Sequence, residues 1–357
     1  MTTEQELLLR CATPPNPDSE AEIAGVLADG KVNWTAFVEH SARQGLVSIV
    51  YRKLRALFPD RIPEETMERL RRLHFANSAK NFYYLRELDA VLSHMTSRGI
   101  PALAFKGPVL AAQIYDDANL RVSSDIDILV RLQDVRGAAE ALLDLGYHPE
   151  LPLRGVRGAL YLFTHNELTM MSDDRAPLEI QWGFVPWHYG FRWDISDTFS
   201  RSCDVKVGNT TCPTLPPEEL LLALTVHGTK HLWEKLLWLC DIAWFVSVTK
   251  NLDWDRIISI SSSSGCRRML FLGLRQARDL FRVELPPGVE RAVQSEHGLE
   301  RLAKEVRANL LNAGNEPVRL HKKMFFFVRA RERRQDRILF ASRTLLNGFT
   351  SGSGLTS

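Results

Sequence analysis

The sequence has few cysteines and no long apolar run. Its five cysteines are widely spaced over 357 residues and include no Cys-x-x-Cys pair, so neither a disulfide framework nor a zinc knuckle is indicated. No apolar stretch approaches the roughly 20 residues that cross a bilayer as a helix. The first residues, Met-Thr-Thr-Glu-Gln-Glu, lack the basic and apolar segments of a secretory signal. We therefore expect a cytoplasmic protein.

The chain also lacks a strong net charge, but its charges are unevenly distributed. The formal net charge is +2, whereas residues 301–345 contain twelve lysines and arginines against four acidic residues. This basic, aromatic region could contact RNA, an acidic partner or an anionic membrane surface. The simpler interpretation is a solvated helix face whose arginines pair with Glu332 and Asp336. The sequence thus predicts at most a weak polyanion contact, and it indicates no oligomeric state.

Hydrophobic periodicity predicts an α+β protein with four segments. These are a helical region over 1–97, an α/β core over 98–215, a second helical region over 216–345 and a disordered tail over 346–357. We expect helices over 64–98, 108–115, 132–145, 234–248, 253–263, 266–281 and 317–345, and strands over 100–105, 125–130, 160–171 and 177–184. A weaker pair of strands is expected around 203–213.

Two carboxylates lie two residues apart in an apolar, β-branched run, Asp125-Ile-Asp127-Ile-Leu-Val130. Successive side chains of a strand alternate between its faces, so Asp125 and Asp127 should point the same way and the isoleucines into a core. Two aligned carboxylates on a buried strand repel each other unless a cation lies between them. The pair therefore predicts a divalent-metal site.

A third acid from another strand would complete such a site. Three carboxylates can hold two magnesium ions roughly 3.5–4 Å apart and promote displacement at phosphorus. Glu179 fits, because it alternates with the apolar residues Leu178 and Ile180 and shares its face with Gln181. Glu167 is the competing candidate, and we favour Glu179.

These residues resemble a known family. Lys106-Gly107, the helix ending at Tyr115, Arg121 and the segment 124–130 are similar to the signature of the polymerase-β-type nucleotidyltransferase superfamily. More narrowly, they resemble its bacterial branch of uncharacterised nucleotidyltransferases. The likeness covers about residues 30–290 and continues in the segments 178–182, 227–233, 238–242 and 252–254.

The resemblance implies a small mixed sheet flanked by helices and transfer of a nucleoside monophosphate from an NTP to an acceptor hydroxyl. It implies that three acids serve as metal ligands and catalytic groups for Mg²⁺, or Mn²⁺, and that five further residues bind the nucleotide. The acids are Asp125, Asp127 and Glu179, and the nucleotide-binding residues are Lys106, Gly107, Arg121, Ser124 and Lys230.

The chain departs from the pattern at two places. Lys106-Gly107 lies eighteen residues before the acids, whereas the wider superfamily has Gly-Ser or Gly-Gly about ten residues before them. Gln181 stands where the branch commonly has histidine.

Several alternatives remain open from the sequence alone. A catalytically inactive protein that binds a nucleotide or a partner would share these residues, and a D-x-D glycosyltransferase would share the acid pair. Lys106 could cap the next helix, and Arg121 could pair with Asp125. His227 and His231 have a spacing suited to a metal, although their aromatic neighbours favour a packed core.

Overall fold

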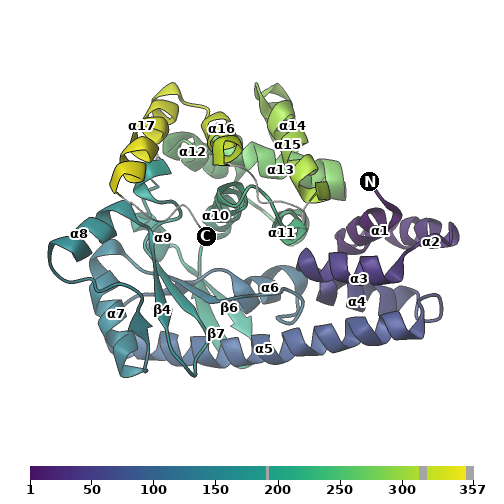
Figure 1. Ribbon diagram of the computed structural model, residues 1–357, viewed down its shortest axis with the longest axis horizontal. Coiled ribbons are helices and arrows are strands. Elements are labelled where there is room, and N and C mark those ends of the chain that lie inside the picture. Colours follow the sequence, from purple (N-terminus) through teal and green to yellow (C-terminus); the bar gives the residue numbers. More distant parts are fainter. Residues whose placement is uncertain (190–192, 313–319, 351–357) are drawn as a thin grey trace.

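The computed structural model describes residues 1–189, 193–312 and 320–350. It shows an α+β fold in which one small sheet lies among helices, as the sequence predicts. In Figure 1 the long helix α5 (Glu64–Ser97) runs beneath the sheet, the other N-terminal helices gather at one end, and the C-terminal helices lie above. No helix within the described ranges is long and apolar enough to span a membrane.

The N-terminal region consists of helices. They are α1 (Thr3–Ala12), α2 (Ser19–Ala28), α3 (Trp34–Arg43), α4 (Val47–Leu57) and α5. The start of α1 has a capping box in which Thr2 and Gln5 satisfy each other's backbone amides. The start of α5 follows Pro63 and places Glu64 and Glu65 in the first turn, where acidic side chains favour a helix.

The central sheet has five strands in the order β1-β2-β5-β4-β3. They are β1 (Leu103–Ala104), β2 (Ile126–Leu129), β3 (His148–Pro149), β4 (Glu167–Met171) and β5 (Leu178–Gln181). Only β2 and β5 pair in parallel; the other pairs are antiparallel. Ile126 and Ile128 of β2 pack in one apolar cluster with residues of α5 and of α7 (Val135–Asp144). Because side chains alternate along a strand, Asp127 is directed to the opposite face.

The connections around the sheet are short helices and a hairpin. They are α6 (Gly107–Tyr115), η1 (Leu132–Asp134), α8 (Gly155–Thr164), η2 (Trp187–Tyr189), α9 (Ser196–Ser200) and the hairpin of β6 (Cys203–Val207) and β7 (Thr210–Thr214). The weaker pair of strands expected around 203–213 is therefore present as this hairpin.

The C-terminal region is helical. Its helices are α10 (Pro217–Lys230), α11 (Leu236–Val248), α12 (Trp254–Ser264), α13 (Arg267–Phe281), α14 (Pro287–Ser295), α15 (Leu299–Asn312), α16 (Leu320–Arg329) and α17 (Arg334–Thr350). One continuous hydrophobic core contains residues from both helical regions, such as Leu7 of α1, Leu54 of α4, Trp244 of α11 and Phe271 of α13. The helical regions therefore pack together as one body beside the sheet.

Two expectations about individual elements were wrong. The strand expected over 160–171 is a helix as far as Thr164, because the His165 amide still bonds to the Tyr161 carbonyl, and β4 begins only at Glu167. The single helix expected over 317–345, of which 317–319 lie outside the described residues, is divided into α16 and α17, and the Arg331 side chain at the break is buried. Helices α14 and α15 have no counterpart among the expected elements.

The tail predicted over 346–357 falls largely outside the described residues. Helix α17 continues to Thr350, five residues beyond the end that we expected, and 351–357 are not described.

Candidate active site

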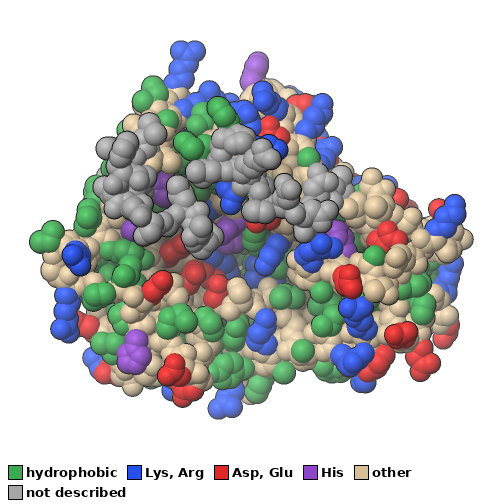
Figure 2. Space-filling model, viewed as in Figure 1, with side chains coloured by type: hydrophobic (Ala, Val, Ile, Leu, Met, Phe, Trp, Pro, Cys, Tyr) green, Lys and Arg blue, Asp and Glu red, His purple; other side chains and the backbone are tan. Residues whose placement is uncertain are grey.

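Parallel pairing of β2 with β5 brings two of the predicted acids side by side. In the register of this pair Asp127 is the direct partner of Glu179, although 52 residues separate them in sequence. Asp125 immediately precedes β2. Figure 2 shows acidic, basic and histidine side chains gathered around a hollow near the middle of the visible face, where Figure 1 places β4 below α10.

Asp127 is the most contacted of these acids. Lys106 donates from Nζ to Asp127 Oδ1 over 2.8 Å, and Gln181 donates from Nε2 to the same oxygen over 2.7 Å. The Gln181 amide also lies 3.1 Å from Glu179 Oε2, so it bridges the two carboxylates. The Lys106 and Asp127 side chains are only 11% and 3% exposed. Lys106 is therefore part of the site and not a surface lysine.

The acids together carry more negative charge than their neighbours neutralise. Burial raises the pKa of Glu179 to about 7, and the charges of Asp127 and Glu167 add to this effect. Burial and then the charge of Asp127 raise the pKa of Asp125. Burial favours a neutral Lys106, but the Asp127 carboxylate outweighs it and raises the pKa of that amine. A carboxylate cluster with raised pKa values fits a divalent cation, whose charge would favour the ionised acids.

Glu167 lies beside this cluster but has its own cation. It is the register partner of Gln181 in the β4–β5 pair, and Lys230, at the end of α10, donates to both of its carboxylate oxygens over 2.9 Å. Burial would raise the pKa of Glu167, but the Lys230 charge outweighs burial and lowers it. Glu167 is thus neutralised within the protein, whereas the charge of Glu179 is not.

Gly107 and Ser124 also lie close to the acids. Gly107 begins α6 directly after Lys106 and has φ +59°, a left-handed conformation that favours glycine. A Cβ at Gly107 would lie 3.9 Å from the Asp125 carbonyl. Ser124 hydrogen-bonds to Asp125, and its carbonyl accepts a 2.8 Å bond from the Tyr84 hydroxyl.

Arg121 is directed elsewhere. Its Nε donates to Asp241 Oδ2 over 3.0 Å, and both side chains are buried. Burial would lower the pKa of Arg121, but Asp241 outweighs burial and raises it. The ion-pair partner of Arg121 is therefore Asp241, and not Asp125 as one sequence alternative held.

His227 and His231 form an aromatic cluster with Trp238. The two imidazole centroids are 4.6 Å apart, and each lies 5.3 Å from the Trp238 ring. Burial and the nearby lysines lower the pKa of His231 to about 4, and burial lowers that of His227 well below its usual value. Both are neutral near pH 7, and the packed-core interpretation of this pair is the one that the contacts support.

Across the described ranges, no group of three or more His, Cys, Asp or Glu side chains has the arrangement of a formed metal site. The Lys106 ammonium, rather than a third carboxylate, makes the closest charged contact to Asp127.

Two features of the site were not predicted from the sequence: the bridging role of Gln181 and the contribution of α5. Alternation in β5 did place Gln181 on the same face as Glu179, but hydrogen bonds to two carboxylates require the fold. The contribution of α5 has a signal in the sequence, because Asn77, Asn81 and Tyr84 recur at helical spacing within an otherwise apolar stripe.

Comparison with known proteins identifies a family for the chain. The model of a family described as uncharacterised nucleotidyltransferase matches residues 30–282, which include the sheet, the acids and helices up to α13. No curated protein sequence matches the chain. The match covers well over half of the chain and every residue of the site described above, so the protein belongs to this family of uncharacterised nucleotidyltransferases.

Proposed function

We propose that the protein is a magnesium-dependent nucleotidyltransferase that moves a nucleoside monophosphate from an NTP to an acceptor hydroxyl. The observation that carries the proposal is the pairing of Asp127 with Glu179 on adjacent parallel strands. Burial also raises the pKa of the Glu179 carboxylate to about 7. Family membership supports the class of reaction.

The acids supply the metal ligands in this proposal. Asp125, Asp127 and Glu179 would hold Mg²⁺, for which Mn²⁺ is the natural substitute because both prefer oxygen ligands. When bound, the metal neutralises charge on the triphosphate and on the departing pyrophosphate. Glu167 is the less suitable third acid, because Lys230 already neutralises its carboxylate.

The neighbouring residues bind the triphosphate. The Lys106 ammonium, which hydrogen-bonds to Asp127, would donate hydrogen bonds to phosphate oxygens once the acids hold a cation. The left-handed turn at Gly107 lets the backbone approach the phosphates without a side chain between them. Lys230, which pairs with Glu167 beside the acids, would supply a second ammonium, and Ser124 holds Asp125. Arg121 supports the site from its buried position against Asp241.

The reaction forms one bond to phosphorus and breaks another. The acceptor oxygen attacks the α-phosphorus, the bond to the β-phosphate oxygen breaks, and pyrophosphate leaves with its electron pair. Glu179 takes the proton of the acceptor hydroxyl. Most of the rate enhancement in such a transfer comes from positioning and from charge stabilisation.

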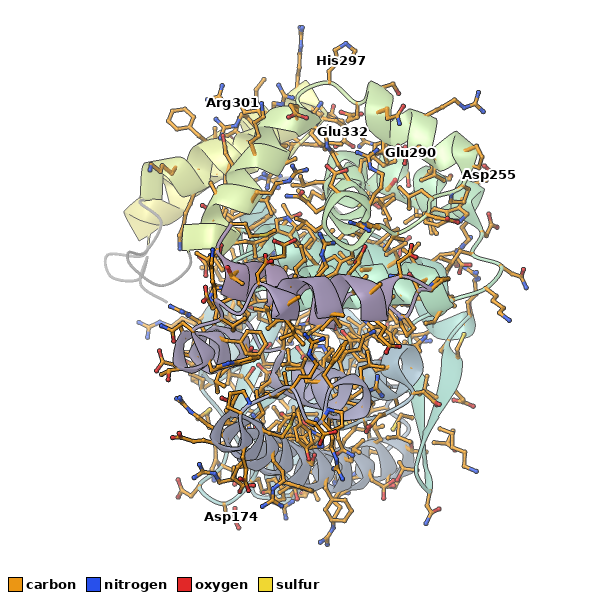
Figure 3. All side chains as sticks on the ribbon, turned by 90° about the vertical axis from the view of Figure 1, so that its right-hand side faces the viewer. Asp174, Asp255, Glu290, His297, Arg301 and Glu332 are labelled. Atoms are coloured by element: carbon orange, nitrogen blue, oxygen red, sulfur yellow. The ribbon has the colours of Figure 1, made fainter. Side chains whose placement is uncertain are left out.

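The proposal is tested by removing one charge at a time. Asp127→Asn and Glu179→Gln preserve shape, and each should lower nucleotide transfer by at least about 100-fold while the protein still folds. Asp173→Asn is the matched control, because this exposed aspartate lies in the β4–β5 turn, next to Asp174, which Figure 3 shows at the end of the molecule away from the C-terminal helices. Each labelled NTP is incubated with Mg²⁺ and host lysate, and labelled products are quantified.

Other outcomes would point to the alternatives. Transfer by Asp127→Asn near the wild-type rate would overturn the assignment. Calorimetric binding of Mg²⁺-NTP without pyrophosphate release over a broad acceptor screen would indicate an inactive nucleotide-binding member. Manganese preference with a nucleoside diphosphate as product would indicate glycosyl transfer.

A further inference from the structure

The segment that carries Asp125 has no regular secondary structure of its own. It runs from Asp116, which ends α6 in a left-handed conformation, to the start of β2 at Ile126. The side chains of two helices distant in sequence, α5 and α11, hold this segment in place. We call residues 116–125 the acid loop.

Helix α5 holds the acid loop through its backbone. Asn81 Nδ2 donates to the carbonyls of Ala118 and Arg121, each over 2.8 Å. Asn77 Nδ2 donates to the Asn119 carbonyl over 2.8 Å. One helical turn further on, the Tyr84 hydroxyl donates to the Ser124 carbonyl. Asparagine and tyrosine side chains therefore replace the hydrogen bonds that a regular element would provide.

Helix α11 holds the loop through a single carboxylate. The two oxygens of Asp241 accept separate bonds: Oδ2 from Arg121 Nε over 3.0 Å and Oδ1 from the Tyr115 hydroxyl over 2.8 Å. Asp241 is only 1% exposed. Arg121 belongs to the acid loop, whereas Tyr115 is the last residue of α6, the helix that begins beside Lys106. One side chain of α11 thus contacts both segments that deliver groups to the site.

Stability alone does not account for this arrangement. Burying an ion pair removes two charges from water, and well-packed apolar residues at the same place are often as stable or more so. A buried polar network does define one geometry, because every donor has a fixed acceptor. Here the network joins Tyr115, at the end of α6, to Arg121, within the acid loop. Lys106 precedes the start of that helix, and Asp125 ends that loop.

We infer that Asp241 is a positioning residue of the active site. Through its hydrogen bonds to Arg121 and Tyr115 it fixes the position of the acid loop relative to α6. The C-terminal helical region therefore contributes to the geometry of the site through Asp241, although none of the three proposed metal ligands belongs to it. This inference rests on the proposed function, because the position of Asp125 and Lys106 affects activity only if they bind the metal and the nucleotide.

The test compares two buried ion pairs of similar exposure. Asp241→Asn breaks the pair with Arg121. Glu296→Gln breaks the pair of Glu296 with Arg268, in which the two side chains are 9% and 10% exposed. Glu296 precedes His297, which Figure 3 shows at the outer edge of the C-terminal helices, far from Asp174. Tyr115→Phe is a milder variant that removes only the hydroxyl bonded to Asp241.

The measurements are thermal unfolding, the rise in melting temperature with added Mg²⁺ or Mn²⁺, and kcat and KM for the NTP. Both ion-pair variants should lose stability. Only Asp241→Asn should also lose at least tenfold in kcat/KM and need more Mg²⁺ for the same rise in melting temperature. Tyr115→Phe should lower kcat/KM by a few-fold and also need more Mg²⁺ for the same rise in melting temperature. This variant keeps the inference testable even if Asp241→Asn fails to fold.

The outcomes separate the inference from the function on which it rests. A wild-type protein that neither responds to Mg²⁺ nor transfers nucleotide would overturn the proposed function and the inference with it. An active wild type, with Asp241→Asn and Tyr115→Phe no more impaired in metal response and kcat/KM than Glu296→Gln, would overturn the inference alone.

Discussion

At the scale of single residues, the site contains more buried carboxylates than lysine side chains that pair with them. Lys106 contacts Asp127 and Lys230 contacts Glu167. Glu179 accepts a hydrogen bond from the neutral amide of Gln181, and burial raises the pKa of Glu179 to about 7. The free energy of unfolding should therefore depend on pH and on divalent cations through the ionisation of Glu179.

The first prediction concerns pH. The folded pKa of Glu179 lies above its unfolded value, so the folded state holds the extra proton and rising pH destabilises it. The protein without metal should lose stability between about pH 4.5 and 7, by at most about 3 kcal/mol from this group. Added Mg²⁺ should raise the melting temperature more at pH 8 than at pH 6, because it binds the ionised acids.

Thermal unfolding at a series of pH values, with and without Mg²⁺, checks this. Glu179→Gln should flatten the dependence above pH 5 and weaken the response to Mg²⁺. An unchanged pH profile in that variant would show that Glu179 does not titrate as described.

The second prediction concerns Lys106. Lys106→Met removes the ammonium from a nearly fully buried carboxylate, and without metal the unfolding free energy should fall by about 3 kcal/mol. Mg²⁺ should restore more stability to this variant than to the wild type, because Asp127 then lacks its internal cation. Urea unfolding measures both effects, with Lys206→Met as the control at an exposed lysine of β6. Equal gains from Mg²⁺ in Lys106→Met and wild type would contradict a metal role for Asp127.

At the scale of elements, the parallel pairing of β2 and β5 and the attachment of the acid loop to α5 make the site. Asn81 is fully buried and is the only described side chain that donates to the Ala118 carbonyl. Removing its amide leaves buried carbonyls without this donor, which costs about 1–3 kcal/mol.

The third prediction follows from this. Asn81→Ala should lose stability in that range and accelerate hydrogen exchange at the amides of residues 118–125. Ser78→Ala, on the same helix, removes only a bond to the helix's own His74 carbonyl and should cost less than about 0.5 kcal/mol. Hydrogen exchange in the acid loop that is equal in the two variants would contradict the role given to α5.

The parts of the site that the sequence predicted are those with local patterns. Alternation along β2 and β5 identified Asp127, Glu179 and their shared face, because strand period is a property of neighbouring residues. The contacts of Lys230 with Glu167 and of Arg121 with Asp241 span 63 and 120 residues, so no local pattern specifies them. Residues 160–164 were misjudged for the same reason, since a short apolar run fits either a strand or a helix and tertiary packing decides.

At the scale of the whole molecule, the two helical regions share one core and the sheet lies against it, with the site at the junction. The basic C-terminal stretch takes part in this packing. Arg331 donates to the Tyr189 carbonyl over 2.8 Å, Arg333 to the carbonyls of Ser262 and Ser263, and Arg329 pairs with Glu305. Much of the positive charge therefore serves internal contacts, and a polyanion contact through this region stays a prediction.

The fourth prediction tests that internal role. Arg331 is fully buried and its guanidinium lies 4.1 Å from the Phe340 ring of α17. Arg331→Met should lower the unfolding free energy by about 2 kcal/mol and increase proteolysis between α16 and α17, whereas Arg334→Met, at an exposed position, should change neither. Similar behaviour of the two variants would show that the inward contacts of Arg331 do not hold these helices.

The central claim is that Asp125, Asp127 and Glu179 support transfer of a nucleoside monophosphate. The most direct measurement follows NTPs labelled at the α-phosphate or at the γ-phosphate, incubated with Mg²⁺, the protein and host lysate. The account predicts that α-label enters an acceptor, γ-label leaves as pyrophosphate, and Glu179→Gln abolishes both. Transfer of γ-label to the acceptor, or α-label transfer that survives in Glu179→Gln, would contradict it.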